Sequence, residues 1–159
     1  MTHRLYLNDD WLFTEQFEDS LAAPGYPENT LQPVRLPHTC KETPFHYFDE
    51  SIYQMVSGYR RHLQIPADWQ GKHILLTFEG AAHDSTVFCN GKKVGEHHCG
   101  YTAFTVDLTD NVLYGQDNLL CVRLDSRENL NVPPFGYVID YMTYGGIYRD
   151  VLLEVKEKV

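Results

Sequence analysis

Apolar and polar side chains alternate along much of this chain, whereas the periodicity of an amphipathic helix is nearly absent. Alternation or short apolar runs occur at 61–65, 73–78, 104–108, 119–125 and 148–155. Segments of this length, separated by Gly, Pro, Asn and Asp, are typical of the strands of an antiparallel β-sandwich. The run at 73–78 is nearly continuous in apolar residues, which predicts a strand buried on both faces. The pattern as a whole predicts an all-β fold.

Turn residues divide these predicted strands. Asn90 and Gly91 stand between the runs 86–89 and 92–97. Both residues tolerate positive φ, so the pair predicts the type I′ turn of a β-hairpin. The N-terminal part is less regular, and four features are expected there: a strand broken by a turn at 5–14, a loop at 18–33, a short edge strand at 34–36 and an irregular stretch at 40–57.

Length and charge limit the function classes that fit. The 159 residues suffice for one domain with a core of its own, so a single domain is expected over residues 1–159. The net charge of −9 argues against nucleic acid, whose binders present a basic face, and against an anionic membrane surface. No apolar run approaches the length of a membrane span. The opening residues lack an apolar run behind a basic start, so the cytoplasm is the expected compartment.

The spacing of cysteine and histidine does not predict a metal site in this chain, and no cofactor is expected within it. There is no C-x-x-C pair, and Cys89 and Cys121 are expected to be small buried side chains in strands. His97 and His98 are adjacent, so on a strand they point to opposite faces and cannot bind one metal together. The other histidines considered lack ligand spacing: His38, His46, His62, His73 and His83.

A series of short motifs runs through the chain in a fixed order. They are Asn8–Phe13, Leu36–His38, Tyr59–Arg61, Phe78–Gly80, Asn90–Gly91, Gly100–Phe104, Asp107–Thr109 and Gly145–Val151. In this order they resemble the N-terminal sugar-binding domain of glycoside hydrolase family 2, the family of β-galactosidases, β-glucuronidases and β-mannosidases. The resemblance implies a jelly-roll β-sandwich. The chain departs from the pattern at Gly58, where many members have Trp, and the change is expected to alter packing rather than fold.

The resemblance points to two candidate sugar-binding residues. Asn90 lies where family 2 β-galactosidases place an Asn that reaches the sugar, and an amide both donates and accepts hydrogen bonds, as hydroxyls do. Its hairpin turn is a structural role beside that one. Asp140 lies where the family places an Asp that bonds hydroxyls of the terminal sugar, and a carboxylate accepts strong hydrogen bonds. The alternative for Asp140 is a solvated loop carboxylate or a partner of Arg149.

The neighbours of Asp140 are expected to serve the structure. Arg149 is expected to bond loop carbonyls or a carboxylate rather than a substrate. Three tyrosines of the same loop are expected to pack it against a following domain, with a stacking face for a sugar as the alternative: Tyr137, Tyr141 and Tyr144. The position of Tyr148 tends to be His in β-glucuronidases, so Tyr at this place favours β-galactosidase.

Glycoside hydrolysis normally requires two carboxylates, which retaining enzymes hold about 5–5.5 Å apart. The adjacent acidic pairs at 9–10 and 49–50 lie in polar loop sequence and are expected to be surface charges. The resemblance places both catalytic Glu residues in a later barrel, so no catalytic residue is expected here and the enzyme activity of this chain is left open. The implied partners are a terminal β-linked sugar and downstream domains of a longer chain. Sodium or magnesium in the full-length enzyme, and a homo-oligomer of it, are also left open.

Three functions fit these observations. The first is the N-terminal carbohydrate-binding domain of a family 2 glycosidase, most closely a β-galactosidase, which shapes the sugar site of a retaining enzyme. The second is a stand-alone carbohydrate-binding module or lectin that uses an exposed aromatic platform. The third is a structural oligomerisation domain, for which the aromatic residues of 40–57 would form the interface.

Overall fold

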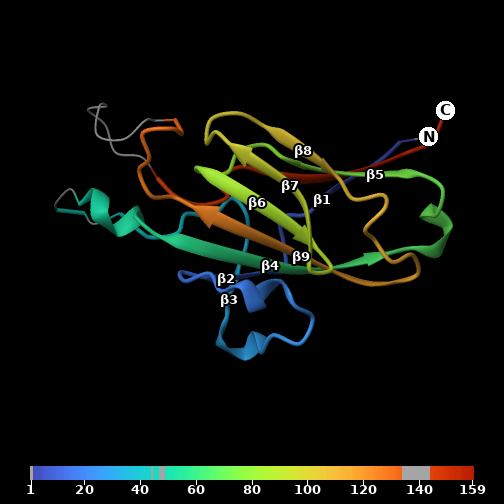
Figure 1. The fold of residues 1–159 in the computed structure, drawn as a ribbon, viewed down its shortest axis with the longest axis horizontal. Coiled ribbons are helices and arrows are strands. Elements are labelled where there is room, and N and C mark those ends of the chain that lie inside the picture. Colours follow the sequence, from blue (N-terminus) through green and yellow to red (C-terminus); the bar gives the residue numbers. More distant parts are fainter. Residues whose placement is uncertain (1, 44, 47–48, 134–143) are drawn as a thin grey trace.

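Two antiparallel sheets lie face to face in the computed structural model, which describes residues 2–43, 45–46, 49–133 and 144–159 (Figure 1). One sheet has the order β1-β10-β5-β8. Its strands are His3–Tyr6, Val151–Lys156, His73–Phe78 and Phe104–Asp107. The other sheet has the order β3-β2-β4-β9-β6-β7. Its strands are Gln32–Val34, Trp11–Thr14, Val56–Ile65, Gln116–Asp125, Asp84–Cys89 and Lys92–His98. The expected all-β antiparallel sandwich of jelly-roll type is confirmed.

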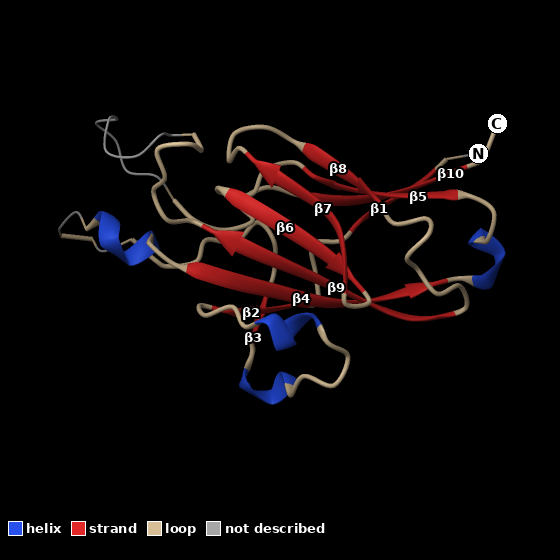
Figure 2. Cartoon of the chain, in the orientation of Figure 1, coloured by secondary structure: helices blue, strands red, loops and turns tan. Residues whose placement is uncertain are grey.

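Short 3₁₀ turns are the helical elements of the described residues (Figure 2). They are η1 (Asp19–Ala22), η2 (Glu28–Thr30), η3 (Glu50–Tyr53) and η4 (Ala67–Trp69). The first two lie within the predicted loop at 18–33, and η3 lies within the predicted irregular stretch at 40–57. In the part of the chain described, no helix is both long enough and apolar enough to pass through a membrane.

The core lies between the two sheets and follows the alternation of the sequence. Leu153 of β10, Leu76 of β5 and Val122 of β9 are fully buried and belong to one cluster. The expectation for the run at 73–78 is wrong in one respect. β5 buries Ile74, Leu76 and Phe78, whereas Leu75 is only partly buried. Leu75, the apolar residue on its outer face, therefore contacts solvent in part, because the described chain covers this sheet on one side only.

A second, smaller cluster lies on the outer face of the six-stranded sheet. Cys121 of β9 and Leu21 of η1 belong to this cluster, and both are buried. A Cβ on Gly58 would stand 2.3 Å from Cδ2 of Leu21. The glycine at this position therefore makes room for η1, which explains the departure at Gly58 as a change in packing. Both Cys89 and Cys121 are buried strand residues, as expected.

The irregular N-terminal part differs from expectation in its boundaries. The break predicted within 5–14 is present at Asp10, which has a φ of 64°, and it sends β1 and β2 into different sheets. The predicted edge strand at 34–36 is β3, which ends at Val34 and pairs with β2. The run at 148–155 becomes a strand only from Val151 onward. In each case hydrogen bonding between distant segments, which the local pattern does not contain, sets the boundary.

Three of the family motifs meet at one buried place. The ring Nδ1 of His38 lies 2.7 Å from the hydroxyl of Tyr59, and the backbone N–H of Ile147 donates to the same hydroxyl at 3.4 Å. Tyr59 is fully buried, and burial lowers the pKa of His38. These contacts fix the loop that precedes β10 against the sheet and thereby position the end of the sandwich described next.

Candidate functional site

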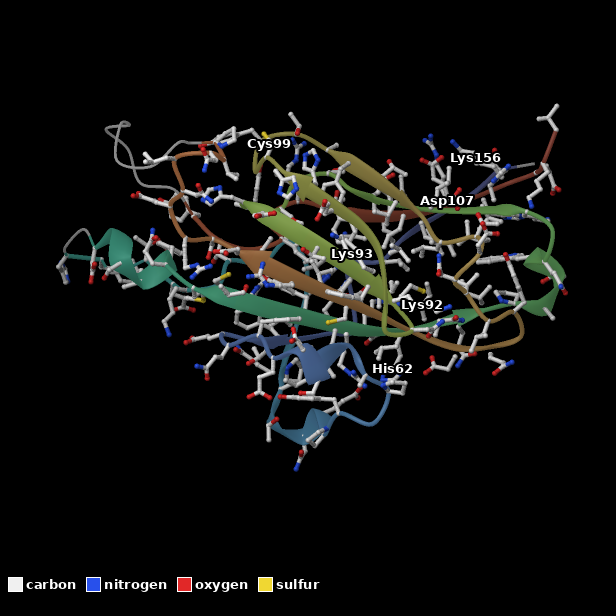
Figure 3. All side chains as sticks on the ribbon, viewed as in Figure 1. His62, Lys92, Lys93, Cys99, Asp107 and Lys156 are labelled. Atoms are coloured by element: carbon white, nitrogen blue, oxygen red, sulfur yellow. The ribbon has the colours of Figure 1, made fainter. Side chains whose placement is uncertain are left out.

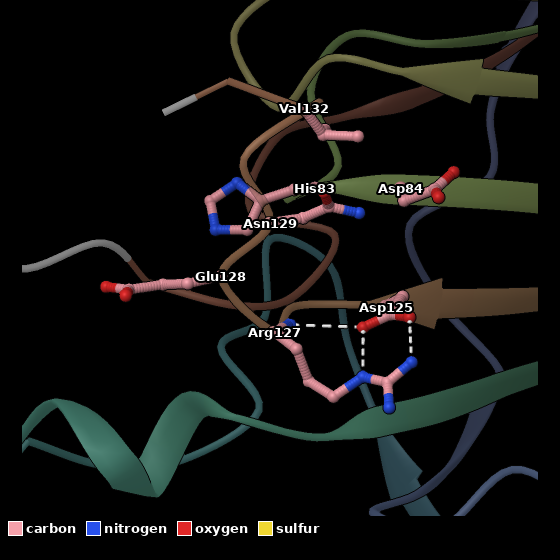
Figure 4. Close-up of a pocket in the computed structure, with 7 residues that line it drawn as sticks. All are labelled: His83, Asp84, Asp125, Arg127, Glu128, Asn129 and Val132. Carbon is pink, nitrogen blue, oxygen red and sulfur yellow. Dashed lines mark hydrogen bonds and ion pairs between the residues drawn. The ribbon is translucent and has the colours of Figure 1, made fainter. Parts of the chain in front are cut away.

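A polar hollow of about 290 Å³ lies at the end of the sandwich where β6 begins and β9 ends (Figure 4). Seven residues line it: His83, Asp84, Asp125, Arg127, Glu128, Asn129 and Val132. Two of them are strand termini, and the others belong to the segments that directly precede β6 and follow β9. Loops held at a strand edge by a rigid sheet are a common location for binding residues.

Two glycines of the C-terminal loop hold the walls of this end together. Gly146 pairs with Ala82 through two backbone hydrogen bonds, of 2.9 and 3.3 Å. A Cβ on Gly145 would stand 2.6 Å from Cβ of Ser126. Ser126 in turn donates from its hydroxyl to the carbonyl of Tyr53 at 2.6 Å. Because neither glycine has a side chain, the Gly-Gly pair of the sequence motif allows three segments to pack closely beside the hollow.

His83 is the most unusual residue of the hollow. The residue is only 4% exposed. Neither nitrogen of its imidazole ring has a hydrogen-bond partner among the described residues. The backbone N–H of His83 donates to the carbonyl of Asp125 at 3.1 Å, which fixes the start of the side chain. Burial lowers the pKa of His83, although the nearby charge of Asp125 acts in the opposite direction. The imidazole is therefore neutral at pH 7, with one donor and one acceptor.

Asp125 and Arg127, which both line the hollow, form a bidentate ion pair. Nε of Arg127 lies 2.9 Å from Oδ1 of Asp125, and Nη2 lies 2.6 Å from Oδ2. Partial burial raises the pKa of Asp125, but the hydrogen bonds and charge of Arg127 outweigh this and hold the pKa below its usual range. Asp84 is also paired, because its Oδ1 lies 2.7 Å from Nδ1 of His98. Both carboxylates therefore have partners within the chain.

Aromatic and aliphatic side chains are exposed at the same end of the molecule. Tyr144 is 46% exposed and packs edge-on against Tyr53, with ring centroids 5.3 Å apart. Tyr101 is exposed and directly follows Gly100, which lies against the ring of His83. Leu130 is exposed and directly follows Asn129 of the hollow. Such side chains suit an interface or the apolar face of a sugar ring.

Asn90 lies at the opposite end of β6 from this hollow. β6 runs from Asp84, which lines the hollow, to Cys89, which precedes Asn90, a length of about 20 Å. In Figure 3, Lys92 at the hairpin and Cys99, which directly follows β7, lie toward opposite ends of the sandwich. The φ values of Asn90 and Gly91 are 50° and 82°, so the predicted type I′ hairpin turn is confirmed.

The amide of Asn90 is used within the chain. Nδ2 donates to the carbonyl of Asn111 at 2.9 Å and to Oδ1 of Asn118 at 2.8 Å. Oδ1 accepts from the backbone N–H of Leu119 at 2.9 Å. These bonds tie the hairpin to the start of β9, which is a structural role. A sugar contact of Asn90 stays a prediction.

The structure gives less information on the other residues that the sequence points to. Asp140 lies outside the described residues, as do Tyr137 and Tyr141, so its sugar contact also stays a prediction. Arg149 is exposed, and no ion pair joins it to any residue that the structure describes. Its Cδ lies close to Gly80. The expectation that Arg149 bonds loop carbonyls or a carboxylate stays a prediction.

Sequence reasoning passed over His83 because its spacing to other histidines fits no metal. Within the described residues, no group of three or more His, Cys, Asp or Glu side chains is arranged to hold a metal ion. The feature that distinguishes His83 is burial without a partner, which spacing along the sequence does not reveal. The one local sign of this site in the sequence was the spacing of Asp125 and Arg127, because residues i and i+2 at the end of a strand lie on the same face of the sheet.

Comparison with known proteins gives consistent matches. A family model described as "Glycosyl hydrolases family 2, sugar binding domain" matches residues 42–157. The β-galactosidase of Thermoanaerobacter pseudethanolicus is 41% identical over 152 residues, covering 95% of this chain and 20% of that protein. The β-glucuronidase of Bacteroides fragilis is 34% identical over 154 residues, covering 97% of this chain and 21% of that protein. The chain thus spans about a fifth of the length of the curated relatives it matches.

Solved structures give the same result. A Bacteroides uniformis β-glucuronidase superimposes with a TM-score of 0.86 at 30% identity, over 98% of this chain and 18% of that one. A structure titled as a putative β-galactosidase from Bacteroides fragilis superimposes with a TM-score of 0.81 at 28% identity, over 98% of this chain and 23% of that one. The likeness therefore extends over the whole described sandwich.

Proposed function

The chain belongs to the sugar-binding domains of glycosyl hydrolase family 2, and we propose that it serves in this role within a longer β-galactosidase. The observation that carries the proposal is the 41% identity to a β-galactosidase over nearly the whole chain, with only a fifth of that relative covered. The domain would wall the sugar site, while a catalytic region elsewhere in the protein would supply the two carboxylates of a retaining mechanism. Terminal β-linked galactose would be the sugar.

Asp140 and Asn90 are the residues proposed to contact that sugar. A carboxylate at 140 would accept hydrogen bonds from two neighbouring hydroxyls. Asn90 would have to use the second lone pair of Oδ1, because both N–H groups of its amide are donated within the chain. Asp140 is therefore the stronger candidate of the two. A sodium or magnesium ion in the full-length site is proposed as well, with its further ligands outside this chain.

The full-length protein tests the proposal with chromogenic β-galactoside and β-glucuronide substrates. Cleavage of the galactoside is expected, with kcat/KM for the glucuronide much lower. Asp140→Ala is expected to lower kcat/KM at least roughly tenfold, which corresponds to about 1.4 kcal/mol of transition-state binding. Asp68→Ala, at an exposed position of η4, is the matched control and should leave the kinetics unchanged. Unchanged kinetics in Asp140→Ala would contradict the assignment of Asp140.

The native mass of the protein in its source distinguishes a domain of a longer glycosidase from a carbohydrate-binding module that acts alone. A mass several times the 18.4 kDa of this chain is expected. A native mass close to 18.4 kDa would contradict the proposal and favour a carbohydrate-binding module that acts alone.

A further inference from the structure

The hairpin turn between β6 and β7 has the chemistry of a spontaneous modification site. Its two residues are Asn90 and Gly91. An Asn side chain is open to attack by the backbone nitrogen of the next residue, and glycine has no Cβ to shield that nitrogen. We propose that Asn90 is a deamidation site that the folded domain holds closed, and that separation of the hairpin from the start of β9 opens it. The proposal does not depend on the sugar or on the activity of the full-length protein.

The reaction needs water as its co-reactant and involves no oxidation. The backbone nitrogen of Gly91 gives up its proton and bonds to Cγ of Asn90, while Nδ2 takes up a proton and leaves as ammonia. The cyclic imide that results adds one water. Cleavage of its bond between nitrogen and Cγ gives aspartate, and cleavage of its bond between nitrogen and the backbone carbonyl carbon gives isoaspartate. The sum is one water consumed and one ammonia released.

The fold holds the reacting amide away from the backbone nitrogen of Gly91. Nδ2 of Asn90 donates to the carbonyl of Asn111 at 2.9 Å and to Oδ1 of Asn118 at 2.8 Å. Oδ1 accepts from the backbone N–H of Leu119 at 2.9 Å. All three partners belong to the start of β9 or to the segment before it. Cyclisation moves Cγ onto the turn and expels Nδ2, so these bonds must break first.

Hydrogen bonding, and not burial of the turn, provides this protection. Gly91 is exposed and Asn90 is only partly buried, so water reaches both. The partners are rigid, because Asn118 is 1% exposed and Leu119 is 4% exposed. The amide of Asn118 is fixed in turn, since its Nδ2 donates to the carbonyl of Leu113 at 2.9 Å. One hydrogen bond contributes about a factor of five to an equilibrium constant, so three bonds make the opening of the amide about a hundredfold unfavourable.

Deamidation in the open state would prevent the hairpin from closing as before. Aspartate at this position faces the carbonyl of Asn111 and Oδ1 of Asn118 with a carboxylate, where the native contacts need two donors. Isoaspartate adds one atom to the backbone of a two-residue turn. That turn sets the pairing of Cys89 with Lys92, so the extra atom disturbs the register of β6 and β7. The modification is therefore a permanent record that the hairpin was open.

The test compares deamidation of Asn90 in the full-length protein, folded in buffer and unfolded in guanidinium chloride at the same pH and temperature. Mass spectrometry of the peptide that contains Asn90 measures the rate. The folded rate is expected to be about a hundredfold below the unfolded rate. Asn29 is the internal control, because it is exposed in η2 and precedes Thr30, whose side chain shields the backbone nitrogen. It should react slowly in both states. Equal folded and unfolded rates at Asn90 would overturn the proposal.

Two variants test whether the hydrogen bonds of the amide are the cause. Asn118→Ala removes an acceptor of Nδ2 and should raise the folded rate at Asn90 at least about fivefold. Asn111→Ala is the matched control, because it keeps the backbone carbonyl that accepts from Nδ2, and its rate should stay within about twofold of the wild type. Tryptophan fluorescence checks that both variants are folded. An unchanged rate in folded Asn118→Ala would overturn the proposal, and the wild-type comparison decides it should that variant not fold.

Limited proteolysis tests the effect of the modification on the hairpin. Full-length protein that has been partly deamidated in denaturant is refolded and treated with protease. In the fraction that resists cleavage, the peptide containing position 90 should hold less aspartate and isoaspartate than in the sample before treatment. Equal shares in the two samples would contradict the expected loss of the closed hairpin.

Discussion

The backbone of Gly146 passes so close to His38 that a Cβ on Gly146 would stand 2.4 Å from the carbonyl oxygen of His38. The φ of Gly146 is 130°, a conformation that residues with a side chain rarely adopt. Both facts follow from the way the C-terminal loop is held between the segment after β3 and the start of β6. The second glycine of the Gly-Gly motif is therefore required by the fold.

Gly146→Ala is expected to lower the free energy of unfolding by about 3 kcal/mol or more, because the new methyl group adds a backbone clash to an unfavourable φ. Chemical denaturation monitored by tryptophan fluorescence measures this difference. Gly25→Ala is the control, since a Cβ there meets no atom within 4 Å and should change stability little. Equal stability of the two variants would show that the loop relaxes freely and would contradict the prediction.

Arg60 joins the 3₁₀ segment to the sheet, and Arg60→Lys is expected to destabilise the protein by about 2–3 kcal/mol. The side chain is 1% exposed, and its guanidinium donates to Glu28 and to the carbonyls of Leu21 and Ala23 at 2.6–2.7 Å. A lysine ammonium cannot reach these acceptors together from one point, so buried acceptors would lose their donors. The measurement is the unfolding midpoint in urea.

The control for Arg60 is Arg4→Lys. Arg4 is 67% exposed and forms a single surface ion pair with Glu154, so a change below about 0.5 kcal/mol is expected. If both variants lost the same stability, the buried hydrogen bonds of Arg60 would contribute no more to the free energy of unfolding than a surface charge does.

His62 is expected to make stability depend on pH. Partial burial lowers the pKa of His62, but hydrogen bonds to Glu28 and Asp117 outweigh this and raise it. The two ring nitrogens lie 2.5 Å from these carboxylates, and Arg60 also contacts Glu28. Because the pKa is raised on folding, the contribution is full below the ordinary pKa of His62 and is lost as pH rises through the raised value. The pKa of Glu28 is lowered, although burial alone would raise it, so its contribution is lost on acidification.

The comparison of His62→Gln with the wild type checks this prediction. The wild type should be the more stable by about 0.5–1 kcal/mol in mildly acidic buffer, a modest value because His62 is about half exposed. The difference should shrink as pH rises above the pKa of His62. A difference that stays constant from mildly acidic to alkaline pH would rule out titration of His62 as its cause.

Asn90→Asp is expected to destabilise the hairpin by about 2 kcal/mol, because a carboxylate replaces the amide N–H groups that face two acceptor oxygens. Those acceptors are the carbonyl of Asn111 and Oδ1 of Asn118. Asp tolerates positive φ as Asn does, so the backbone turn itself should persist. Asn90→Gly keeps the turn and removes the whole amide, and comparison of the two by thermal melting separates loss of bonds from repulsion.

Several features were predictable because they depend on neighbours in the sequence. Alternation placed the strands, since a residue two positions away lies on the same face. Asn90 and Gly91 predicted their turn because the φ preferences of these two residues are local. The motif order predicted the family and, through it, the jelly-roll sandwich. Gly58 also marked a real change, which η1 and Leu21 explain.

The features that local patterns missed depend on contacts between distant segments. The division of 5–14 between two sheets follows from pairing with β10 and β3, which lie far apart in the chain. His83 carried no signal at all, since its isolation from partners exists only when β6, β9 and the Gly100 loop close around it.

By itself, then, the sequence determined the strand content, the hairpin at Asn90 and the family, because each rests on local backbone preference or on a linear order of motifs. The tertiary structure alone decided that the amide of Asn90 is used inside the chain, that Gly146 has no room for a side chain and that His83 faces a polar hollow. Burial, steric contact and unsatisfied hydrogen bonding are relations between residues far apart in the chain, and they exist only once the two sheets have packed together.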